Sequence, residues 1–533
     1  MNFSVKKSSA LIYSIISYLI IVSAEYYLTV TKLAGKFTYC LDDAYTHMAI
    51  AKNAALHSVW GVTQHNFSSS TSAPLWTFIL AISFKLFGVY SIIPLILNII
   101  IGLFIIISAY KILARYVKDG TTLLVLLLAL IIVVPIPLLA FVGMESLLHI
   151  FFVSLFIQYL IPAFNEENKK SFYLLLIIAA LVCMVRYESY FMILATSFIF
   201  LYEKKIIKAF LLLVSGWVLI SVYGFWSMSH GWYFFPNTLL VKGNLPSLTI
   251  SGIVSFLQIV FSKMSNFSHI YGLLFITTLF ILKDLYSKDK QLNFVSKFNY
   301  ILFVTLVIHV STAYVAPYYR YEAYLVFLGI IGAVLNLSQM ESKLKSLLSK
   351  SSKLEYPFTI ALLIIMLSPF IYRGVGGLIS IAPGSKNIHD QQCQMAFFIN
   401  KYYQNNIVAI NDIGAISFYT DAHIIDLVGL SDLDVLRLIR NNKFKTTEIE
   451  ALTKRKNFDI AVIYDTWFDN PMVGGIPKSW VKCGSWMVSS IRSIPDAKVT
   501  FYASDSTRAK HLVNNLKEFN KTNLPKDIAC QFY

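Results

Sequence analysis

The sequence predicts a multi-pass α-helical membrane protein that ends in a C-terminal α/β domain. Hydrophobic residues make up 56% of the 533 positions and charged residues only 14%, which is more apolar surface than a soluble protein can bury. Apolar runs of about 17–25 residues, the length that crosses about 30 Å of hydrocarbon, recur along the first two thirds of the chain. From Gly376 onward the composition changes, and short β-branched runs alternate with more polar, helix-like stretches.

Clusters of Lys and Arg between the apolar runs orient the chain, because such clusters stay on the cytoplasmic side of a membrane. They lie at 6–7, 111–118, 169–170, 204–208, 283–297 and 343–353. An even number of spans between consecutive clusters predicts about eleven transmembrane helices in a bacterial inner membrane, with everything after Gly376 in the periplasm. The expected spans are 9–31, 91–113, 121–142, 147–162, 171–185, 187–202, 206–228, 269–283, 298–315, 322–337 and 357–375.

Two segments fit this scheme less simply. The stretch Pro74 to Val89 is apolar but short and contains a lysine, so we expect a juxtamembrane helix inside a first periplasmic loop at 34–90. The segment 171–202 is interrupted by Arg186 and Glu188. It forms either one long span that buries both charges or two short spans, and the charge rule favours two.

The chain therefore divides into a membrane domain, residues 1–375, and a periplasmic α/β domain, residues 376–533. In the second domain, Ile407–Ile410 and Ile460–Tyr464 are predicted strands and Gln391–Tyr403 is a predicted helix. The cytoplasmic loops are too short to hold a domain. This excludes a cytosolic ATPase.

The net charge of +16 does not indicate a nucleic-acid partner, because most of the Lys and Arg of residues 1–375 lie in these clusters, where they orient the chain in the bilayer. The apolar stretch Ser9–Val30 lacks a convincing cleavage site, so we expect an uncleaved first span rather than a signal peptide.

Of the five cysteines, Cys393, Cys483 and Cys530 fall in the C-terminal domain and can form one disulfide in the periplasm, although the spacing does not say which pair.

The unusual polar residues all fall on the periplasmic side of this topology. Ionisable residues near membrane depth are costly and are tolerated when they line a cavity or pair with one another. We therefore expect these residues to form a single site. They are Asp42, Asp43, Glu145, Arg186, Glu188, Asn237, Lys242 and Arg320.

Asp42 and Asp43 are the candidate catalytic residues. A carboxylate within hydrogen-bond reach of an acceptor hydroxyl can take its proton as a general base. Adjacent carboxylates point in different directions, so we expect one to face the acceptor and the other a cation or the backbone. The alternative is that they cap a predicted amphipathic interfacial helix at Ala44–Ala54, where acids are favoured by the helix dipole.

A divalent cation, Mg²⁺ or Mn²⁺, is the candidate cofactor, with Asp43, His47 and Glu145 as candidate ligands. His47 follows Asp43 by four residues, so both can face one side of a helix. Glu145 stands where a span emerges and can bind a cation or a sugar hydroxyl. The alternatives are a surface histidine at 47 and an ordinary helix-start acid at 145.

Arg186, Lys242 and Arg320 are the candidate phosphate ligands, because a lipid-linked phosphate needs cations beside an apolar groove. For the two arginines the alternative is an ion pair with a near neighbour in sequence, Glu188 for Arg186 and Glu322 for Arg320. For Lys242 it is an ordinary interfacial lysine.

Several short motifs, in this order, resemble those of GT-C fold glycosyltransferases, and most closely the terminal arabinofuranosyltransferases of mycobacterial cell walls and their bacterial relatives. The likeness runs from about residue 10 to 435, and its strength lies in the order of motifs that are each weak alone. The motifs are Leu41-Asp42-Asp43-Ala44-Tyr45, Ala51-Lys52-Asn53, Ser70-Thr71-Ser72-Ala73-Pro74-Leu75-Trp76, Gly143-Met144-Glu145, Arg186-Tyr187-Glu188, Pro236-Asn237-Thr238 with Lys242, Tyr319-Arg320-Tyr321, Asp412-Ile413-Gly414-Ala415 and Asp426-Leu427-Val428-Gly429-Leu430.

The resemblance implies a polyprenyl-phosphate sugar as donor and a glycan or glycolipid as acceptor, joined by an inverting transfer. It also implies that an acid of the first outer loop, Asp42 or Asp43, is the catalytic base. The sequence departs from the family at Arg186-Tyr187-Glu188, where relatives usually have proline after the arginine. Arabinose is therefore not assumed as the donor sugar.

Three other functions fit a membrane protein of this composition. A transporter or flippase of lipid-linked sugars would show inverted repeats and charges near the bilayer midplane, whereas no repeat is visible and the polar groups lie outward. A polysaccharide ligase or polymerase would carry a large outer loop rather than a C-terminal domain. A non-catalytic glycan-binding membrane protein is the third.

Overall fold

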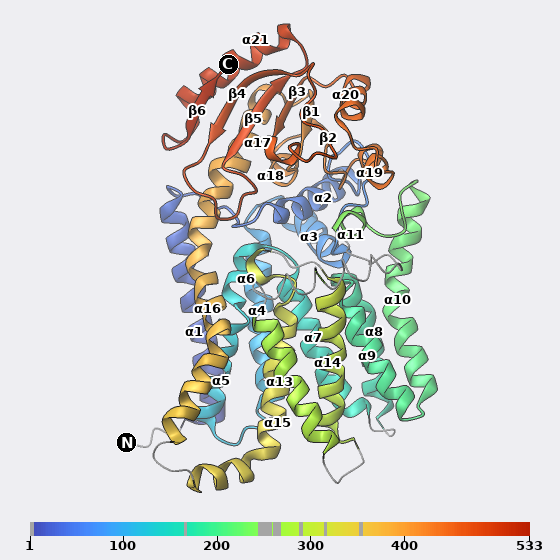
Figure 1. The fold of residues 1–533 in the computed structure, drawn as a ribbon, viewed down its shortest axis with the longest axis vertical. Helices are drawn as coiled ribbons and strands as arrows, with labels where there is room; N and C mark the ends of the chain where they lie inside the picture. Colours follow the sequence, from blue (N-terminus) through green and yellow to red (C-terminus); the bar gives the residue numbers. More distant parts are fainter. Residues whose placement is uncertain are drawn as a thin grey trace.

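The computed structural model describes residues 5–164, 168–242, 258, 268–286, 292–313, 317–350 and 355–533. A helical bundle carries a C-terminal domain at one end, and the first helix, α1 (Lys7–Lys32), starts at the opposite end (Figure 1). Short helices and loops fill the level between the bundle and the domain.

The bundle helices coincide with the expected spans, and the expected span at 121–142 corresponds to two consecutive helices, α5 and α6. Within the described residues, eight segments are long and apolar enough to cross a membrane, so the total of eleven spans stays a prediction. Besides α1, the helices are α4 (Ile93–Leu113), α5 (Gly120–Val133), α6 (Ile136–Val142), α7 (Ser146–Ala163), α8 (Lys169–Val185), α9 (Ser189–Tyr202), α10 (Ile206–Ser229), α13 (Ser268–Leu285), α14 (Phe294–Thr312), α15 (Ala323–Lys350) and α16 (Glu355–Ile388).

The ambiguous segment 171–202 forms two helices, α8 and α9, rather than one. Neither is among the eight segments long and apolar enough to cross a membrane, so the two short spans stay a prediction. The chain leaves helical geometry at Arg186, whose backbone is extended (φ −150°, ψ 126°). The break lets this charged side chain lie at the ends of two helices instead of inside one hydrocarbon-spanning helix.

Helix α10 shows how the bundle meets lipid. Its large apolar side chains face outward, with Ile207 75% exposed and Phe210 63% exposed. Exposed aliphatic and aromatic side chains of this density would be a liability in water, whereas in hydrocarbon they are the favoured surface. The chain is a multi-pass membrane protein.

Lysines from clusters far apart in the sequence meet at the end of the bundle away from the C-terminal domain. Lys7 Nζ donates to the carbonyl of Ala114 at 2.9 Å, and Lys205 Nζ donates to the carbonyl of Phe164 at 2.9 Å. Cations near helix C-termini are stabilised by the carbonyls that no helical N–H reaches. The clusters at 6–7 and 204–208 therefore lie at the same end of the bundle.

Two short helices, α2 (Asp43–His57) and α3 (Pro74–Phe87), lie between the bundle and the C-terminal domain (Figure 1). Helix α3 is the expected juxtamembrane helix. The expected amphipathic helix at 44–54 is part of α2, but the prediction that it lies on the interface with one face exposed was wrong. Its side chains are buried in almost every direction, because α3 and helix α18 of the C-terminal domain (Gly414–Tyr419) pack against it.

The expected domain boundary at 376 falls inside a helix. Helix α16 continues without a break to Ile388 and is followed directly by one π-helical turn, η2 (His389–Cys393), and by α17 (Gln394–Tyr402). A continuous helix thus rises from the bundle into the domain (Figure 1). The change of composition near 376 therefore falls within a helix and does not mark its end.

The C-terminal domain contains a mixed six-stranded sheet with the order β2-β1-β3-β5-β4-β6. Strands β2, β1 and β3 are parallel, and β5, β4 and β6 continue the sheet antiparallel. Both predicted strands are present. The strands are β1 (Ile407–Ile410), β2 (His423–Asp426), β3 (Ile460–Ile463), β4 (Val481–Met487), β5 (Lys498–Ala503) and β6 (Ala529–Phe532).

Alternate residues of the central strands face two separate cores, as the period of a strand requires. Val462 and Phe501 point to the side covered by α17 and α21, where Phe398 packs against Phe501. Ala461 and Ile463 point to the side covered by α20. The remaining helical segments are α11 (Asn237–Lys242), η1 (Pro317–Tyr319), α19 (Leu433–Arg440), α20 (Thr446–Arg455), η3 (Asp465–Trp467) and α21 (Ser506–Thr522).

The expected disulfide is absent, because all five cysteines lie in the described residues and all are free thiols. The strand register explains why the closest candidates do not pair. Cys530 on β6 stands opposite Trp486 of β4, whereas Cys483 is three positions away along β4. Cys393 lies on η2, outside the sheet.

Candidate active site

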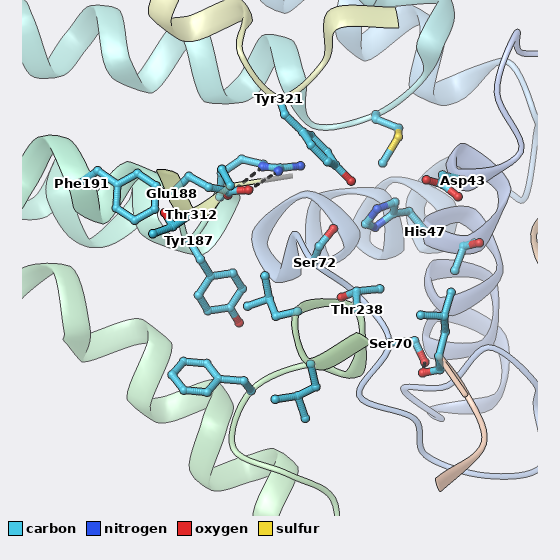
Figure 2. Close-up of a pocket in the computed structure, with 18 residues that line it drawn as sticks. Asp43, His47, Ser70, Ser72, Tyr187, Glu188, Phe191, Thr238, Thr312 and Tyr321 are labelled. Carbon is cyan, nitrogen blue, oxygen red and sulfur yellow. Dashed lines mark hydrogen bonds and ion pairs between the residues drawn. The ribbon is translucent and has the colours of Figure 1, made fainter. Parts of the chain in front are cut away.

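A cavity of about 390 Å³ lies where the bundle, the first loop and the C-terminal domain meet (Figure 2). Polar and apolar side chains both line it, and polar groups stand on both sides: Glu188 lies beside Phe191, whereas Asp43 and His47 lie across the cavity (Figure 2). The polar lining residues are Asp43, Thr46, His47, Ser70, Ser72, Arg186, Glu188, Thr238 and Thr312, and the apolar and aromatic ones are Met144, Tyr187, Phe191, Phe235, Leu239, Leu240, Ala313, Tyr321 and Leu430.

Asp43, the first residue of α2, lies on the cavity wall (Figure 2). Its side chain is 35% exposed, and its Oδ2 accepts a hydrogen bond from Arg320 at 2.6 Å. Arg320 follows a tight turn in which Tyr318 and Tyr319 have φ angles of 63° and 58°. Left-handed backbone at two bulky residues costs free energy and is kept where the surroundings demand it. The turn here delivers a guanidinium to the Asp43 carboxylate.

Asp42 points away from the cavity, as expected for adjacent carboxylates. It is 6% exposed, and its two oxygens accept hydrogen bonds from the backbone N–H groups of Gly414 and Ala415, at 2.8 Å each. It makes no capping hydrogen bond to its own helix, so the interpretation of this residue as the cap of α2 was wrong. Instead it caps α18, a helix of the other domain.

Burial raises the pKa of Asp42 well above its ordinary value, and the neighbouring carboxylate of Asp412 raises it further. Burial also raises the pKa of Asp412, whose Oδ2 accepts hydrogen bonds from Gln392 at 2.9 Å and from the hydroxyl of Tyr464 at 3.3 Å. These groups follow the carboxyl ends of β1 and β3, so the polar edge of the parallel strands faces the membrane domain.

A buried ion cluster forms the floor of the cavity. Arg186 donates to Glu145 at 2.7 Å and to both oxygens of Glu188, at 2.5 and 3.2 Å, and its guanidinium stacks 3.9 Å from the ring centre of Tyr321. Glu145 is fully buried. It reaches this position because Gly143 adopts φ +73° at a point where a Cβ would lie 2.5 Å from the Tyr39 ring.

His47 is buried, not a surface residue. Its Nδ1 lies 2.9 Å from Thr77 Oγ1 and 3.1 Å from Thr71 Oγ1, and its Nε2 lies 3.7 Å from Glu145 Oε2. Burial lowers the pKa of His47 below its ordinary value. The ring is therefore neutral at pH 7.

The three candidate metal ligands do not assemble into a metal site. Among the described residues, no group of three or more His, Cys, Asp or Glu is arranged to hold a metal ion. Asp43 is paired with Arg320 and Glu145 with Arg186. His47 lies beside Thr71 and Thr77, so each of the three candidate ligands already has a partner in the protein.

The candidate phosphate ligands differ in their surroundings. Arg186 lines the cavity and pairs with Glu188, as the alternative interpretation predicted. The pair expected for Arg320 with Glu322 is absent: Arg320 pairs with Asp43, and Glu322 lies 3.7 Å from Arg373. Lys242 is the last residue of α11, and its side chain lies outside the described part of the structure.

Asn237 was a predicted substrate ligand, but it joins three segments of the protein. It is fully buried. Its backbone N–H donates to the carbonyl of Ser69 at 2.8 Å, and its Nδ2 donates to the carbonyl of Gly429 at 3.0 Å. The first loop, α11 and the C-terminal domain are thereby held together behind the cavity wall, which the next residue, Thr238, lines.

We expect Asn237→Ala to lower the free energy of unfolding by about 1–3 kcal/mol, because it leaves the buried Gly429 carbonyl without a partner. Denaturant titration of the detergent-solubilised protein measures the loss. The matched control is Asn441→Ala, at the solvent-exposed end of α19. Equal stability of the two variants would contradict the structural role of Asn237.

Several cavity residues had no predicted role. Ser70 and Ser72 stand in a motif that was noted without a function, and Ser70 Oγ donates to the carbonyl of Leu430 at 2.7 Å. Leu430 brings the C-terminal domain into the cavity wall. Asp426 organises its loop by accepting hydrogen bonds from Ser431 N–H at 2.6 Å and from Val428 N–H at 2.9 Å. The motif Asp426–Leu430 is thus a wall-forming loop.

Burial raises the pKa of Asp426 from 3.8 to about 6, although the hydrogen bonds from its loop oppose the shift. A carboxyl group with a raised native pKa holds its proton more tightly in the folded state. Its contribution to stability is therefore complete below about pH 3.8 and is lost as pH rises through about 6. We expect the denaturant concentration at the midpoint of unfolding to fall for the wild type, relative to Asp426→Asn, as the pH is raised from about 3.8 to about 6. Parallel pH profiles would contradict the shift.

The chain was compared with known proteins. A family model described as a domain of unknown function (DUF8728) matches residues 386–502, which lie in the C-terminal domain. No curated protein sequence matches the chain. Among solved structures, ArnT from Cupriavidus metallidurans bound to undecaprenyl phosphate is similar, with a TM-score of 0.53 and 10% identity over 92% of this chain and 98% of that chain.

The apo structure of ArnT from the same organism matches with a TM-score of 0.51 and 9% identity, over 94% of this chain and 99% of that chain. At such identities the likeness concerns the fold. It spans the bundle and the C-terminal domain together, and it confirms the predicted architecture, whereas the narrower resemblance to terminal arabinofuranosyltransferases stays a prediction. The chain is a multi-pass membrane protein of the GT-C fold.

Proposed function

We propose that this protein transfers a sugar from a polyprenyl-phosphate donor to a glycan or glycolipid acceptor at the periplasmic face of a bacterial inner membrane. The observation that carries the proposal is the mixed lining of the cavity. Its apolar side chains, such as Phe191, Leu239 and Ala313, suit an isoprenoid chain, and its charged and hydroxyl side chains suit a sugar and a phosphate. The shared fold with ArnT, whose structure holds undecaprenyl phosphate, supports the same class of lipid.

In the proposed reaction Asp43 is the general base. Its carboxylate takes the proton of an acceptor hydroxyl while the hydroxyl oxygen attacks the anomeric carbon. The bond between that carbon and the phosphate oxygen breaks on the opposite face of the sugar, and both electrons leave with the polyprenyl phosphate. The products are an inverted glycoside, a lipid phosphate and a protonated Asp43.

Arg320 supports this role for Asp43. A guanidinium 2.6 Å from the carboxylate favours the ionised form that a base needs and fixes its direction. Asp43 keeps a third of its surface open toward the cavity, so an acceptor hydroxyl can approach it. Asp42, with both oxygens on backbone N–H groups, has no such approach.

Among the described residues, Arg186 is the cationic side chain that lines the cavity. We propose that it faces the donor phosphate. Its charge is shared with Glu145 and Glu188, so the phosphate would have to displace Glu188, which is the more exposed of the two carboxylates. Lys242, at the end of α11 beside the cavity residues Thr238 and Leu240, is the second candidate.

The placement of the lysine clusters supports the orientation. Positive clusters mark the cytoplasmic side, and those at 6–7 and 204–208 lie at the bundle end that is opposite the C-terminal domain. The cavity and that domain would then both lie on the periplasmic side.

A transfer assay with the purified full-length protein tests the proposal. Wild type in lipid nanodiscs receives a panel of polyprenyl-phosphate sugars with envelope glycans or glycolipids as acceptors, and release of free polyprenyl phosphate is measured. We expect at least one donor and acceptor pair to turn over and Asp43→Asn to be inactive with it. Movement of an intact lipid-linked sugar across vesicles, without cleavage, would overturn the proposal in favour of a flippase.

A further inference from the structure

Asp42, which immediately precedes helix α2, and Lys52 within it form hydrogen bonds with the two ends of helix α18 of the C-terminal domain. At the start of α18, the carboxylate of Asp42 accepts the N–H groups of Gly414 and Ala415. At its end, Lys52 Nζ donates to the carbonyls of Phe418 at 3.0 Å and Thr420 at 3.3 Å. The two contacts lie on one short segment of the first loop, and together they hold the whole length of α18.

The acidic Asp42 and the basic Lys52 each bind the end of α18 that carries the opposite partial charge. The first N–H groups and the last carbonyls of any helix have no partner within it, and they carry partial positive and negative charge respectively. An acid at the start and a cation at the end satisfy both. Helix α18 has six residues, too few to be stable alone, so its geometry depends on these contacts.

The backbone at Gly414 is fitted to Asp42. A Cβ at this position would lie 2.2 Å from Asp42 Oδ2 and 2.3 Å from the Asp42 carbonyl oxygen. Glycine is therefore needed for the carboxylate to reach the helix start. Asp42 is 6% exposed, which makes both hydrogen bonds sheltered from water and hard to replace.

The residue after Asp42 is Asp43, and the partner that orients Asp43 belongs to another part of the fold. Arg320 precedes α15 of the bundle, whereas Asp43 begins α2, which rests on the C-terminal domain. Other contacts between the domains hold loops, such as Ser70 to Leu430 and Asn237 to Gly429. On α2 itself, the ring of Tyr45 also packs against Phe418 and Tyr419 of α18. The direction of the Asp43 side chain relative to Arg320 therefore depends on how α2 packs against α18.

We propose that Asp42 and Lys52 are positioning residues that clamp α18 of the C-terminal domain onto α2 and thereby hold Asp43 at the cavity. Asp42 is thus not the base. The kinetic consequence rests on the function proposed above, whereas the clamp itself does not. The C-terminal domain acts as a structural part of the active site through this contact.

Amide hydrogen exchange of the full-length protein in nanodiscs tests the clamp without any substrate. In Asp42→Asn the new amide group turns one N–H toward a backbone N–H, so one of the two hydrogen bonds is lost. We expect exchange of peptides covering 412–420 to accelerate about 10-fold, with the same result for Lys52→Met, while β3 and β5 keep wild-type exchange. Unchanged exchange at 412–420 in both variants would overturn the clamp, and so would equal acceleration in β3, which would indicate a general loss of domain stability.

Kinetics tests the positioning role. A displaced base lowers kcat without weakening donor binding, and a shift of about 1 Å can cost about 100-fold. We expect Asp42→Asn and Lys52→Met to lower kcat with an unchanged KM for the polyprenyl-phosphate sugar, and Lys52→Arg to restore most of the rate. Lys517→Met, on the outer helix α21, is the matched control and should match wild type.

The outcomes separate the two proposals. If Asp42→Asn is as inactive as Asp43→Asn while its exchange is unchanged, Asp42 is itself catalytic and the positioning role is wrong. If exchange accelerates as expected but no polyprenyl-phosphate sugar is turned over by wild type, the clamp stands and the proposed function fails.

Discussion

Asp43→Asn is expected to lower the rate of sugar transfer by about 100- to 10,000-fold, the range over which general bases contribute. The asparagine keeps the size of the side chain but cannot accept a proton, and its amide group opposes the guanidinium of Arg320, which now lies 2.6 Å from a carboxylate oxygen. Initial rates of polyprenyl-phosphate release measure the effect. Binding of the donor should persist, because the apolar side chains of the cavity are unchanged.

Asp434→Asn is the matched control, because this carboxylate is 41% exposed on α19 and pairs only with surface cations. We expect it to retain the wild-type rate. Transfer by Asp43→Asn at the wild-type rate would remove Asp43 from the mechanism, since the other carboxylate among the described cavity residues, Glu188, is paired with Arg186.

Arg186→Met is expected to have the largest effect on stability. It leaves Glu145, which is fully buried, and Glu188 without the cation that both contact, and breaking a buried pair by removing one partner costs about 3–5 kcal/mol. Denaturant titration of the detergent-solubilised protein, followed by tryptophan fluorescence, measures the loss. Transfer should fall as well, because Arg186 lines the cavity.

The double variant Arg186→Met with Glu145→Gln separates charge from packing. Neutralising the more buried carboxylate should recover a substantial part of the lost stability, because an uncompensated charge is the main cost. Arg186→Lys should be intermediate, since an ammonium cannot reach both carboxylates in the way that a guanidinium does. A double variant that is no more stable than Arg186→Met would show that the stacking on Tyr321, not the charge, dominates.

The spans, the juxtamembrane helix α3 and the strands β1 and β3 were predictable, because each depends on the composition of a few consecutive residues. The break at Arg186 was also predictable, since a charged residue inside a span is expensive. The boundary at 376 was not: hydropathy reports where a helix leaves hydrocarbon, and α16 continues to Ile388. Likewise α2 was expected to lie on the interface, because nothing in 44–54 shows that another domain covers it.

The candidate site was partly predictable. The sequence alone identified the carboxylates and arginines, because charged residues beside membrane spans are few and need a cavity or a partner. It did not identify Leu430 as part of the cavity wall, or Asn237 as the residue that joins three segments, since both depend on contacts with the C-terminal domain. Nor did the sequence show the partners of the candidate metal ligands: Asp43 and Glu145 pair with arginines far along the chain, and His47 lies beside two threonines.

By itself the sequence determined the membrane class of this protein, the course of its helices and the pair of acids to examine, because local hydropathy and charge decide those features. Only the tertiary structure decided which acid faces the cavity. Neighbouring side chains diverge, and the partners that settle the matter lie 372 residues from Asp42, at Gly414, and 277 residues from Asp43, at Arg320. Contacts over such separations exist only once the chain has folded, the first between the two domains and the second within the membrane domain.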